Sequence, residues 1–209
     1  MPVRAEIEGL PFSLLRDADK QHLQQLTFIG KIEWLKARVN LVLISPLRSA
    51  LNSWEQDQLG MVLVTGLCAG ISAASTFLKG RRPRPRQETD RDFFLDFVRL
   101  YMAPVEPVLN AAPNVTHWVG RPAATWAEWL YLYVRNGLAH AFTIEQGGFH
   151  HGLPALIDDS DPAEPVIDAA RLLDAFERGW TAYLNDVRTH GEQSLLGRAF
   201  TTRWDDLFL

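Results

Sequence analysis

The chain has 209 residues, a formal net charge of −4 at pH 7 and an apolar fraction of 47%. This length suits one well-buried domain and is short for two, so we expect a single globular domain over residues 1–209. The acidic balance argues against a protein that coats nucleic acid generally, because such domains are usually basic, but it allows an enzyme with a local basic groove.

The cysteine count and the first residues indicate a compartment. Cys68 is the single cysteine, which rules out an internal disulfide framework and fits a reducing interior. The first ten residues, MPVRAEIEGL, contain no apolar run of signal-peptide length. We therefore expect a cytoplasmic protein, with Cys68 acting as a small buried apolar side chain.

The residue pattern in the first third of the chain predicts an extended arm followed by a long helix. Residues 1–12 show no clear period and are interpreted as an N-terminal arm. Apolar residues recur at helical spacing from about residue 14 to residue 42. Pro46 follows Ser45, and because the residue before a proline is pushed away from helical angles, we expect the helix to end or kink there.

A second long helix is predicted over residues 54–79. Ser53 and Gln56 form a capping-box candidate at its start, and residues 59–78 contain no charge. The charge-free run with basic residues after it is typical of a membrane span, but a central helix buried in a bundle gives the same pattern. Its hydroxyl and small side chains and the absence of a second span favour the buried helix, so we expect no membrane association.

Small residues recur on one side of this helix, and they would allow close helix contact within the bundle or across a dimer. They are Gly66, Gly70, Ala73 and Ala74.

A basic loop follows, in which two prolines break regular structure and five cations lie within eight residues. The cations are Lys79, Arg81, Arg82, Arg84 and Arg86. Either this loop is a solvated linker, or it contacts a phosphate backbone that leads into an active groove. Thr89 and Asp92 then predict the start of a helix with a strong aromatic face, and two prolines, Pro104 and Pro107, end it. Residues 104–124 are interpreted as an irregular crossover with one short helical turn.

The segment from Thr125 to Phe142, TWAEWLYLYVRNGLAHAF, is the most informative stretch of the chain. Thr125 and Glu128 form a capping box that predicts a helix start, and an apolar stripe follows at three- and four-residue steps. The rival interpretation is a hairpin, because Asn136-Gly137 is a strong turn signal. The capping box and the length of the run favour the helix.

Polar residues inside this apolar segment need a partner or a function. In a helix, Asn136 and His140 share a face, and Arg135 reaches that side through its long side chain. The functional interpretation competes with a plain structural one, in which Arg135 pairs with Glu128 or Glu145 and His140 is a hydrogen-bonded core residue.

The last third of the chain predicts a hairpin, a long helix and a packed tail. Gly147-Gly148 lies between short β-capable runs, which favours a small β-hairpin. His150 and His151 would point to opposite faces of a strand, and no spacing typical of a metal site is present, so we predict no metal and no cofactor. Asp168 can cap the last long helix, and residues 191–209 should pack back on the bundle.

The run Arg135-Asn136-Gly137-Leu138-Ala139-His140 resembles the Arg-x4-6-His motif of the HEPN superfamily (higher eukaryotes and prokaryotes nucleotide-binding domains). The order of the helices around it is similar to stand-alone bacterial HEPN proteins over most of residues 20–190. The resemblance implies an all-α HEPN-like helical bundle, here with the small hairpin after the motif helix. It also implies a dimer in which two motifs face each other, and often a metal-independent endoribonuclease.

The residue types of the motif suit this chemistry. RNA carries its own nucleophile, the 2′-hydroxyl, so cleavage needs a base, an acid and a cation that stabilises the phosphorane charge. His140 can act as acid or base at neutral pH, Arg135 can bind phosphate oxygens, and Asn136 can orient the imidazole or bind phosphate. One chain supplies one such histidine, so acid plus base favours a composite site in a two-fold homodimer.

The predicted function is therefore RNA cleavage at this composite site, in a toxin or phage-defence effector under the control of an antitoxin or regulatory protein. The alternative is a catalytically silent HEPN-like dimer that binds nucleotide or protein. Two positions depart from the family pattern. Phe142 stands where some members have a tyrosine that accepts a nucleotide, and residues 59–78 lack the acidic residue that relatives often have there.

Overall fold

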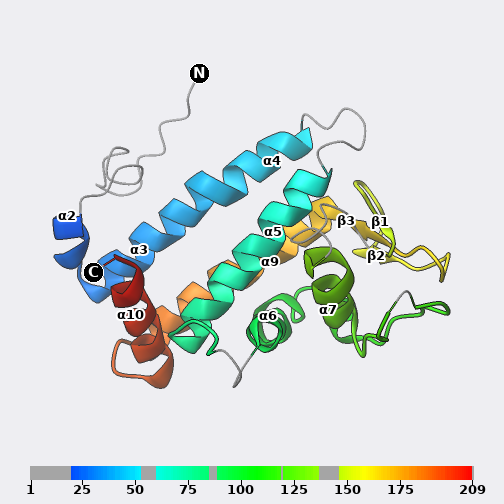
Figure 1. Ribbon diagram of the computed structural model, residues 1–209. Coiled ribbons are helices and arrows are strands. Elements are labelled where there is room, and N and C mark those ends of the chain that lie inside the picture. Colours follow the sequence, from blue (N-terminus) through cyan, green and yellow to red (C-terminus); the bar gives the residue numbers. More distant parts are fainter. Residues whose placement is uncertain (1–19, 53–59, 85–88, 119, 137–145, 209) are drawn as a thin grey trace.

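The computed structural model describes residues 20–52, 60–84, 89–118, 120–136 and 146–208 (Figure 1). The protein is mainly helical. Helices pack side by side around the central helix α5, and a small sheet lies at one end of the bundle.

The N-terminal part is a broken helix. After α2 (Lys20–Gln24), helix α3 (Phe28–Val39) starts at Thr27, whose Oγ1 accepts a hydrogen bond of 3.1 Å from the Gly30 N–H. A π-helical segment (Asn40–Ile44) then leads directly into α4 (Ser45–Asn52). The predicted helix from residue 14 to residue 42 is confirmed over residues 28–42 but is interrupted at residues 25–27, and residues 14–19 lie outside the described ranges.

Pro46 does not end or kink this helix as predicted. The backbone N–H of Ser45 donates to the carbonyl of Asn40, five residues back. Because the hydrogen-bond ladder has already shifted by one residue, the proline, which has no N–H and crowds the carbonyl four residues before it, enters where the regular α-helical bond is absent.

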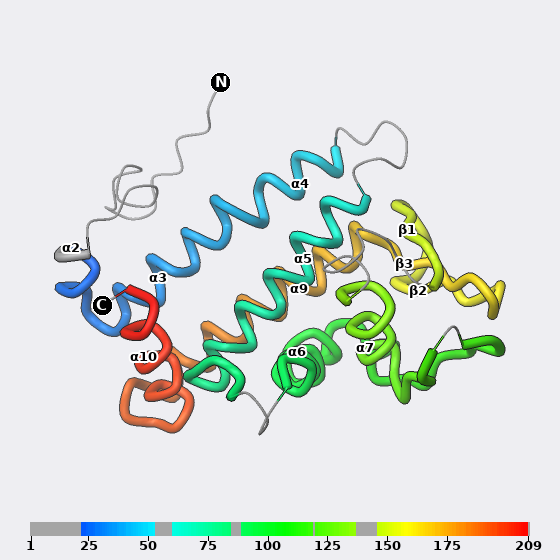
Figure 2. Tube along the Cα trace, viewed as in Figure 1, coloured from blue at the N-terminus to red at the C-terminus, as the bar shows by residue number. Residues whose placement is uncertain are grey.

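The central helix α5 (Gly60–Lys79) ends at Gly80, whose φ of 71° suits a glycine. Figures 1 and 2 show α3 and α4 on one side of α5, α6 and α7 on the other, and α9 alongside. Of the helices in the described ranges, α5 alone is long and apolar enough to span a membrane, but 44% of its apolar window is buried within the protein. It packs against α6, α9 and α10. The capping box predicted at Ser53 lies outside the described residues.

Helix α6 (Asp90–Phe97) starts with the capping box predicted from Thr89 and Asp92, which is confirmed. It continues as a second π-helical segment (Val98–Met102), and the crossover contains one 3-10 turn (Pro107–Asn110), as expected. Helix α7 (Trp126–Trp129) passes into a third π-helical segment (Leu130–Arg135). The helical interpretation of residues 126–136 is confirmed, and the hairpin alternative is wrong.

The small sheet differs from the predicted hairpin. Its strands are β1 (Gly148–His150), β2 (Ile157–Asp158) and β3 (Val166–Asp168), in the order β1-β3-β2. Strand β1 pairs parallel with β3, and β2 pairs antiparallel with β3. Gly147 adopts a φ of 89°, and the Gly148 N–H donates to the carbonyl of Pro165 at 3.0 Å. The described half of the predicted hairpin therefore pairs with residues 166–168, and the run before Gln146 lies outside the described residues.

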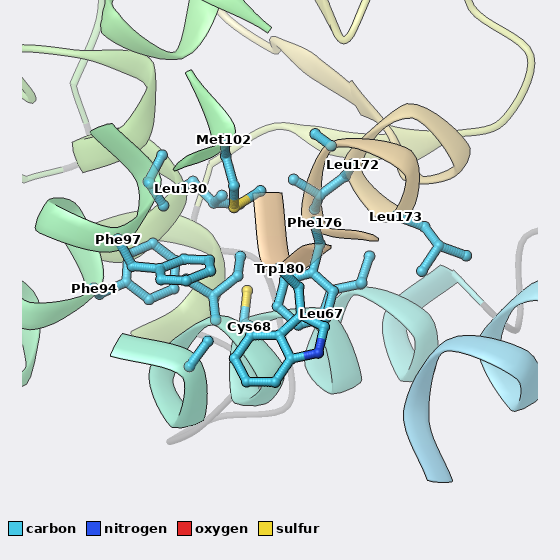
Figure 3. Packing of buried hydrophobic residues seen from close by; sticks show 14 of the residues in the cluster. Leu67, Cys68, Phe94, Phe97, Met102, Leu130, Leu172, Leu173, Phe176 and Trp180 are labelled. Carbon is cyan, nitrogen blue, oxygen red and sulfur yellow. The ribbon is translucent and has the colours of Figure 1, made fainter. Parts of the chain in front are cut away.

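The C-terminal part follows the prediction. Helix α9 (Ala169–His190) begins at Asp168, whose Oδ1 accepts from the Arg171 N–H at 2.8 Å. Helix α10 (Leu195–Phe208) packs back on α5 and α9, so the prediction for the tail is confirmed. Figure 3 shows the core between α5, α6 and α9, where Cys68, Phe97 and Phe176 lie close together.

Candidate functional site

The predicted motif begins where a buried helix reaches the surface. Eight of the nine side chains from Trp126 to Val134 are buried, because α7 and the π-helical segment after it are enclosed by neighbouring elements. At Arg135 the side chain becomes 26% exposed, and Asn136 is half-buried. A π-helical turn widens a helix locally and is frequent at functional sites. The described part of the motif, Arg135 and Asn136, thus presents polar side chains at the surface of the bundle.

The guanidinium of Arg135 is held by three partners. Its Nη2 lies 2.5 Å from Asp90 Oδ2, and its Nη1 donates to Asn136 Oδ1 at 3.1 Å. The guanidinium carbon lies 5.3 Å from the centroid of the Tyr131 ring, a cation–π distance, and the Tyr131 hydroxyl donates to the same Asp90 oxygen at 3.4 Å. These contacts fix the orientation of the side chain and leave part of it exposed to solvent.

The positive charge of Arg135 influences the pKa values of two buried acids, Tyr131 and Cys68. Burial raises the pKa of Tyr131, although the positive charge of Arg135 acts in the opposite direction, so the phenol remains a donor to Asp90. Burial raises the pKa of the Cys68 thiol to about 12, again against the influence of Arg135. Cys68 is free and buried, as expected, and it stays a protonated core side chain at neutral pH.

His140 lies outside the described residues, together with Gly137 and Glu145. The predicted proximity of His140 to Arg135 and Asn136 therefore stays a prediction. The alternative pairing of Arg135 with Glu128 is wrong, because Asp90 is the partner of Arg135 and Glu128 binds other arginines.

The described cations of the basic loop pack against acidic and aromatic side chains. Lys79 forms an ion pair with Asp96, and both Lys79 and Arg81 lie over the ring of Phe93, at 5.7 and 5.4 Å from its centroid. Arg82, with 70% of its side chain exposed, lies 4.0 Å from Asp206 on α10. Arg84 is exposed, and Arg86 lies outside the described residues.

The basic loop and Arg135 contact neighbouring turns of α6. Arg135 contacts Asp90, the first residue of α6, whereas Lys79 contacts Asp96, six residues further along. Six residues correspond to about 9 Å of helix axis. Among the described residues, Lys79 and Arg81 also contact Phe93, three residues from Asp90, so these cations and Arg135 lie along the same helix.

The capping box predicted from Thr125 and Glu128 at the start of α7 forms only in part. The Thr125 Oγ1 accepts from the Glu128 N–H at 3.2 Å, as predicted, but the Glu128 carboxylate does not return to Thr125. It accepts from the Ala124 N–H at 2.9 Å, from Arg91 at 2.5 Å and from Arg121 at 2.7 Å. Burial alone would raise the pKa of Glu128, but these donors outweigh it and hold the pKa below its ordinary value.

The first turn of α6 takes part in both ion-pair groups, that of Arg135 and that of Glu128. Asp90 binds Arg135, and the next residue, Arg91, binds Glu128 at the start of α7. Neither Asp90 nor Arg91 was predicted to belong to the site. The only signal in the sequence was the Thr89 cap, which locates the helix start but says nothing about contacts 37 to 45 residues away.

In the described part of the chain, no group of three or more His, Cys, Asp or Glu side chains is arranged to hold a metal ion. His150 and His151 are both exposed at the end of β1.

Comparisons of the chain with protein-family models, with curated proteins and with solved structures gave no match. The HEPN resemblance therefore rests on the motif at residues 135–140 and on the order of the helices.

Proposed function

We propose that the protein is a metal-independent endoribonuclease that cleaves RNA at a composite site in a homodimer. The observation that carries this proposal is the oriented, partly exposed guanidinium of Arg135, held between Asp90 and Tyr131 beside Asn136. A fixed planar cation of this kind suits the phosphate oxygens that gain charge in the transition state.

In the proposed reaction, His140 of one protomer accepts the proton of the RNA 2′-hydroxyl as its oxygen attacks phosphorus. His140 of the second protomer donates a proton to the departing 5′-oxygen, so the products are a 2′,3′-cyclic phosphate and a 5′-hydroxyl. Arg135 from each chain stabilises the charge on the phosphorus oxygens, and Asn136 orients the imidazole or binds phosphate. Asp90 acts as a positioning residue that holds Arg135.

The proposed setting is a cytoplasmic toxin or phage-defence effector, with an antitoxin or regulatory protein as a further partner. The free buried thiol of Cys68 and the packing of α5 inside the bundle support a soluble protein in a reducing compartment.

The proposal is tested by incubating the purified protein with single-stranded RNA in excess EDTA and mapping both new ends. We expect cleavage that leaves a 2′,3′-cyclic phosphate. His140→Ala should abolish it, and Arg135→Lys should reduce it by about 100-fold, because lysine cannot reproduce the planar fork. Arg198→Ala, which removes an exposed cation on α10, serves as the control and should retain full activity. Cleavage that needs added metal, or that survives His140→Ala, contradicts the mechanism.

A specific observation favours the alternative, a catalytically silent dimer that binds nucleotide or protein. Lys79 and Arg82 already have carboxylate neighbours, Asp96 and Asp206. A working nuclease should use both groups of cations on one RNA strand.

Salt-dependent binding of a non-cleavable 2′-deoxy oligonucleotide separates the two functions. If RNA follows the basic loop, replacing Arg82 and Arg84 by Ala should lower the salt dependence of binding by about 1.4, because each phosphate contact on a single strand contributes roughly 0.7 to the logarithmic slope. An unchanged slope in the absence of any cleavage would favour the silent module.

A further inference from the structure

One face of α5 stays exposed in the bundle although it carries no charge between Gly60 and Leu78. Its exposed positions recur at three- and four-residue steps, which places them on one side of the helix. They are Val62, Thr65, Ala69 and Ala73. Val62 is 64% exposed, and Met61 beside it is also exposed. A continuous apolar face of this kind, unlike a single exposed apolar residue, marks a surface that another molecule covers.

A groove of about 300 Å³ extends this face toward α3. Helix α5 forms one wall of the groove, and residues between Val39 and Leu43, at the end of α3 and in the π-helical segment after it, form the other. In the described part of the chain, every residue that lines the groove is apolar or a glycine, and Val42 is 51% exposed. The exposed apolar surface therefore continues from α5 onto the neighbouring helix.

The threonine hydroxyls on this side of α5 are satisfied within the helix. The Thr65 hydroxyl donates to the carbonyl of Met61 at 2.6 Å, and the Thr76 hydroxyl donates to the carbonyl of Ala73 at 2.8 Å. A hydroxyl that bonds back to its own helix has no proton left for a ligand. The face therefore contributes apolar packing, and it suits a partner surface that is equally apolar.

The shape of the face suits a second copy of the chain. Its larger side chains, Met61 and Val62, lie at the N-terminal end of α5, and the small ones, Ala69 and Ala73, lie further along. In a two-fold pair with antiparallel α5 helices, the large end of each helix meets the small part of the other. Because the face carries no charge, the two copies meet without like-charge repulsion.

The extent of the face matches the centre of a dimer interface. Helix α5 rises about 17 Å from Val62 to Ala73, and with the neighbouring helix the face is about 20 Å wide, which gives roughly 300 Å² for each protomer. A standard interface buries about 800 Å² for each partner, with an apolar centre and a polar rim. The face supplies such a centre, and the polar residues that border it supply the rim.

Arg135 lies beside the same helix, near the border of this face. The π-helical segment Leu130–Arg135 contacts α5, and the charge of Arg135 acts on the thiol of Cys68, close to the middle of α5. Thr65, three residues before Cys68, shares its side of the helix and is exposed. A two-fold axis through the middle of the face therefore sets one Arg135 on either side of the axis.

We infer that the exposed face of α5 and the adjoining groove form the homodimer interface, with the two-fold axis near Ala69. The α5 helices of the two protomers pack antiparallel, so that Val62 of one chain lies against the turn that contains Ala73 of the partner subunit. The inference rests on the proposed function in one respect, because the partner copy supplies the second His140 and Arg135 that the composite site needs.

The mass of the full-length protein in solution tests the interface. Light scattering after size-exclusion chromatography should give a dimer, and Ala69→Arg should halve the mass, because the new charge meets an apolar surface and its own copy at the axis. Ala182→Arg changes an exposed alanine of α9 and is the matched control, which should remain a dimer. Thermal melts of both variants show that each stays folded.

Ala69→Cys gives a second test that keeps the face apolar. A residue near a two-fold axis lies opposite its own copy, so oxidation with diamide should link most chains into a disulfide-bonded dimer. The thiol of Cys68 is buried and protonated and does not compete. The control, Ala182→Cys, should stay largely unlinked.

The outcomes separate this interface from the nuclease proposal. A monomeric original protein, or a dimer that persists in Ala69→Arg and does not cross-link through Ala69→Cys, would overturn the interface. Cleavage of RNA by such a persistent dimer would leave the proposed function standing. Loss of the dimer in Ala69→Arg, when the original protein cuts no RNA, would support the interface and contradict the nuclease. A monomer that sediments with phosphatidylcholine vesicles would assign the face to a lipid surface instead.

Discussion

At the scale of single residues, the carboxylate of Asp90 determines how Arg135 meets a phosphate. The two side chains lie 2.5 Å apart at the first turn of α6, and both are partly exposed. A carboxylate partner lowers the conformational freedom of a long side chain but also competes with a phosphate for the same charge. Because we propose that Asp90 positions Arg135, we expect the gain in orientation to be larger than the competition with phosphate.

Asp90→Asn should lower RNA cleavage by about tenfold with little change in thermal stability, because the amide holds the guanidinium less firmly. Asp92→Asn is the matched control two residues away. The carboxylate of Asp92 completes the Thr89 capping box, so its loss should reduce stability by about 1 kcal/mol and leave cleavage intact. Cleavage rates and thermal melts measured on both variants separate the roles. Faster cleavage by Asp90→Asn would mean that Asp90 restrains the arginine.

Glu128 provides a test of stability against pH. Its pKa lies below the ordinary value of 4.5 in the folded protein, because the donors from Ala124, Arg91 and Arg121 outweigh the effect of burial. The stability contributed by this carboxylate is therefore present above pH 4.5 and is lost as the pH falls through the lower, folded-state pKa.

Glu128→Gln should lower the free energy of unfolding by about 2 kcal/mol at pH 7, since a buried charged acceptor is replaced by a neutral amide. The difference from the original protein should shrink in acid, because protonated Glu128 resembles the glutamine. Urea unfolding at pH 7 and at pH 3 measures both values. Glu192→Gln, at an exposed position between α9 and α10, should change neither. A constant difference at both pH values would contradict the assignment.

At the scale of elements, close approach between helices depends on a few glycines. A Cβ on Gly179 of α9 would lie 2.9 Å from the backbone carbonyl oxygen of Tyr101, in the π-helical segment after α6. A Cβ on Gly66 of α5 would meet the end of the Leu47 side chain at 3.3 Å. Backbone cannot yield in the way that a flexible side chain can.

Gly179→Ala should therefore destabilise the protein by about 2 kcal/mol through overpacking. Gly66→Ala should be neutral or stabilise by up to about 1 kcal/mol, because alanine favours the helix and Leu47 can move. Chemical denaturation of the two single variants tests the comparison directly. Equal destabilisation by both variants would show that α5 and α4 pack as tightly as α9 and the π-helical segment after α6.

The elements that sequence could predict are those whose cause is local. The caps at Thr89, Thr125 and Asp168 depend on residues three positions away, and each accepts the predicted backbone hydrogen bond. The buried stripe of α9 and the packing of the tail follow from helical periodicity. These features are encoded within a few turns of chain.

The features that sequence could not predict depend on distant partners. Strands of two or three residues, such as β1 and β3, carry almost no periodic signal, and their parallel pairing joins segments 18 residues apart. The π-helical turn before Pro46 replaces a break that the proline alone would predict. Likewise, the Arg135–Asp90 and Glu128–Arg91 pairs join α6 to the motif helix across 45 and 37 residues. Each needs the tertiary fold to bring the partners together.

At the scale of the whole molecule, the bundle accounts for one face of the charge-free run of α5. The helix contacts α6, α9 and α10, and Leu63, Val64, Leu67 and Ile71 have no exposed surface. Met61 and Val62 lie on another face, which stays exposed. The helix of residues 126–136 is largely buried up to Val134, so the bundle supports the partly exposed Arg135.

The proposed mechanism requires one motif from each of two protomers, and this requirement can be tested without knowing the dimer interface. If one His140 acts as base and the second as acid, a dimer of one original and one His140→Ala chain is inactive. When subunits exchange freely, a ninefold excess of His140→Ala chains leaves about one original chain in ten paired with another original chain. The cleavage rate per original chain should then fall about tenfold. The same excess of Arg198→Ala chains should not lower it, because that variant keeps both histidines. A rate per original chain that is unaffected by His140→Ala, after exchange has been verified with differently labelled chains, would mean that each protomer cuts RNA by itself.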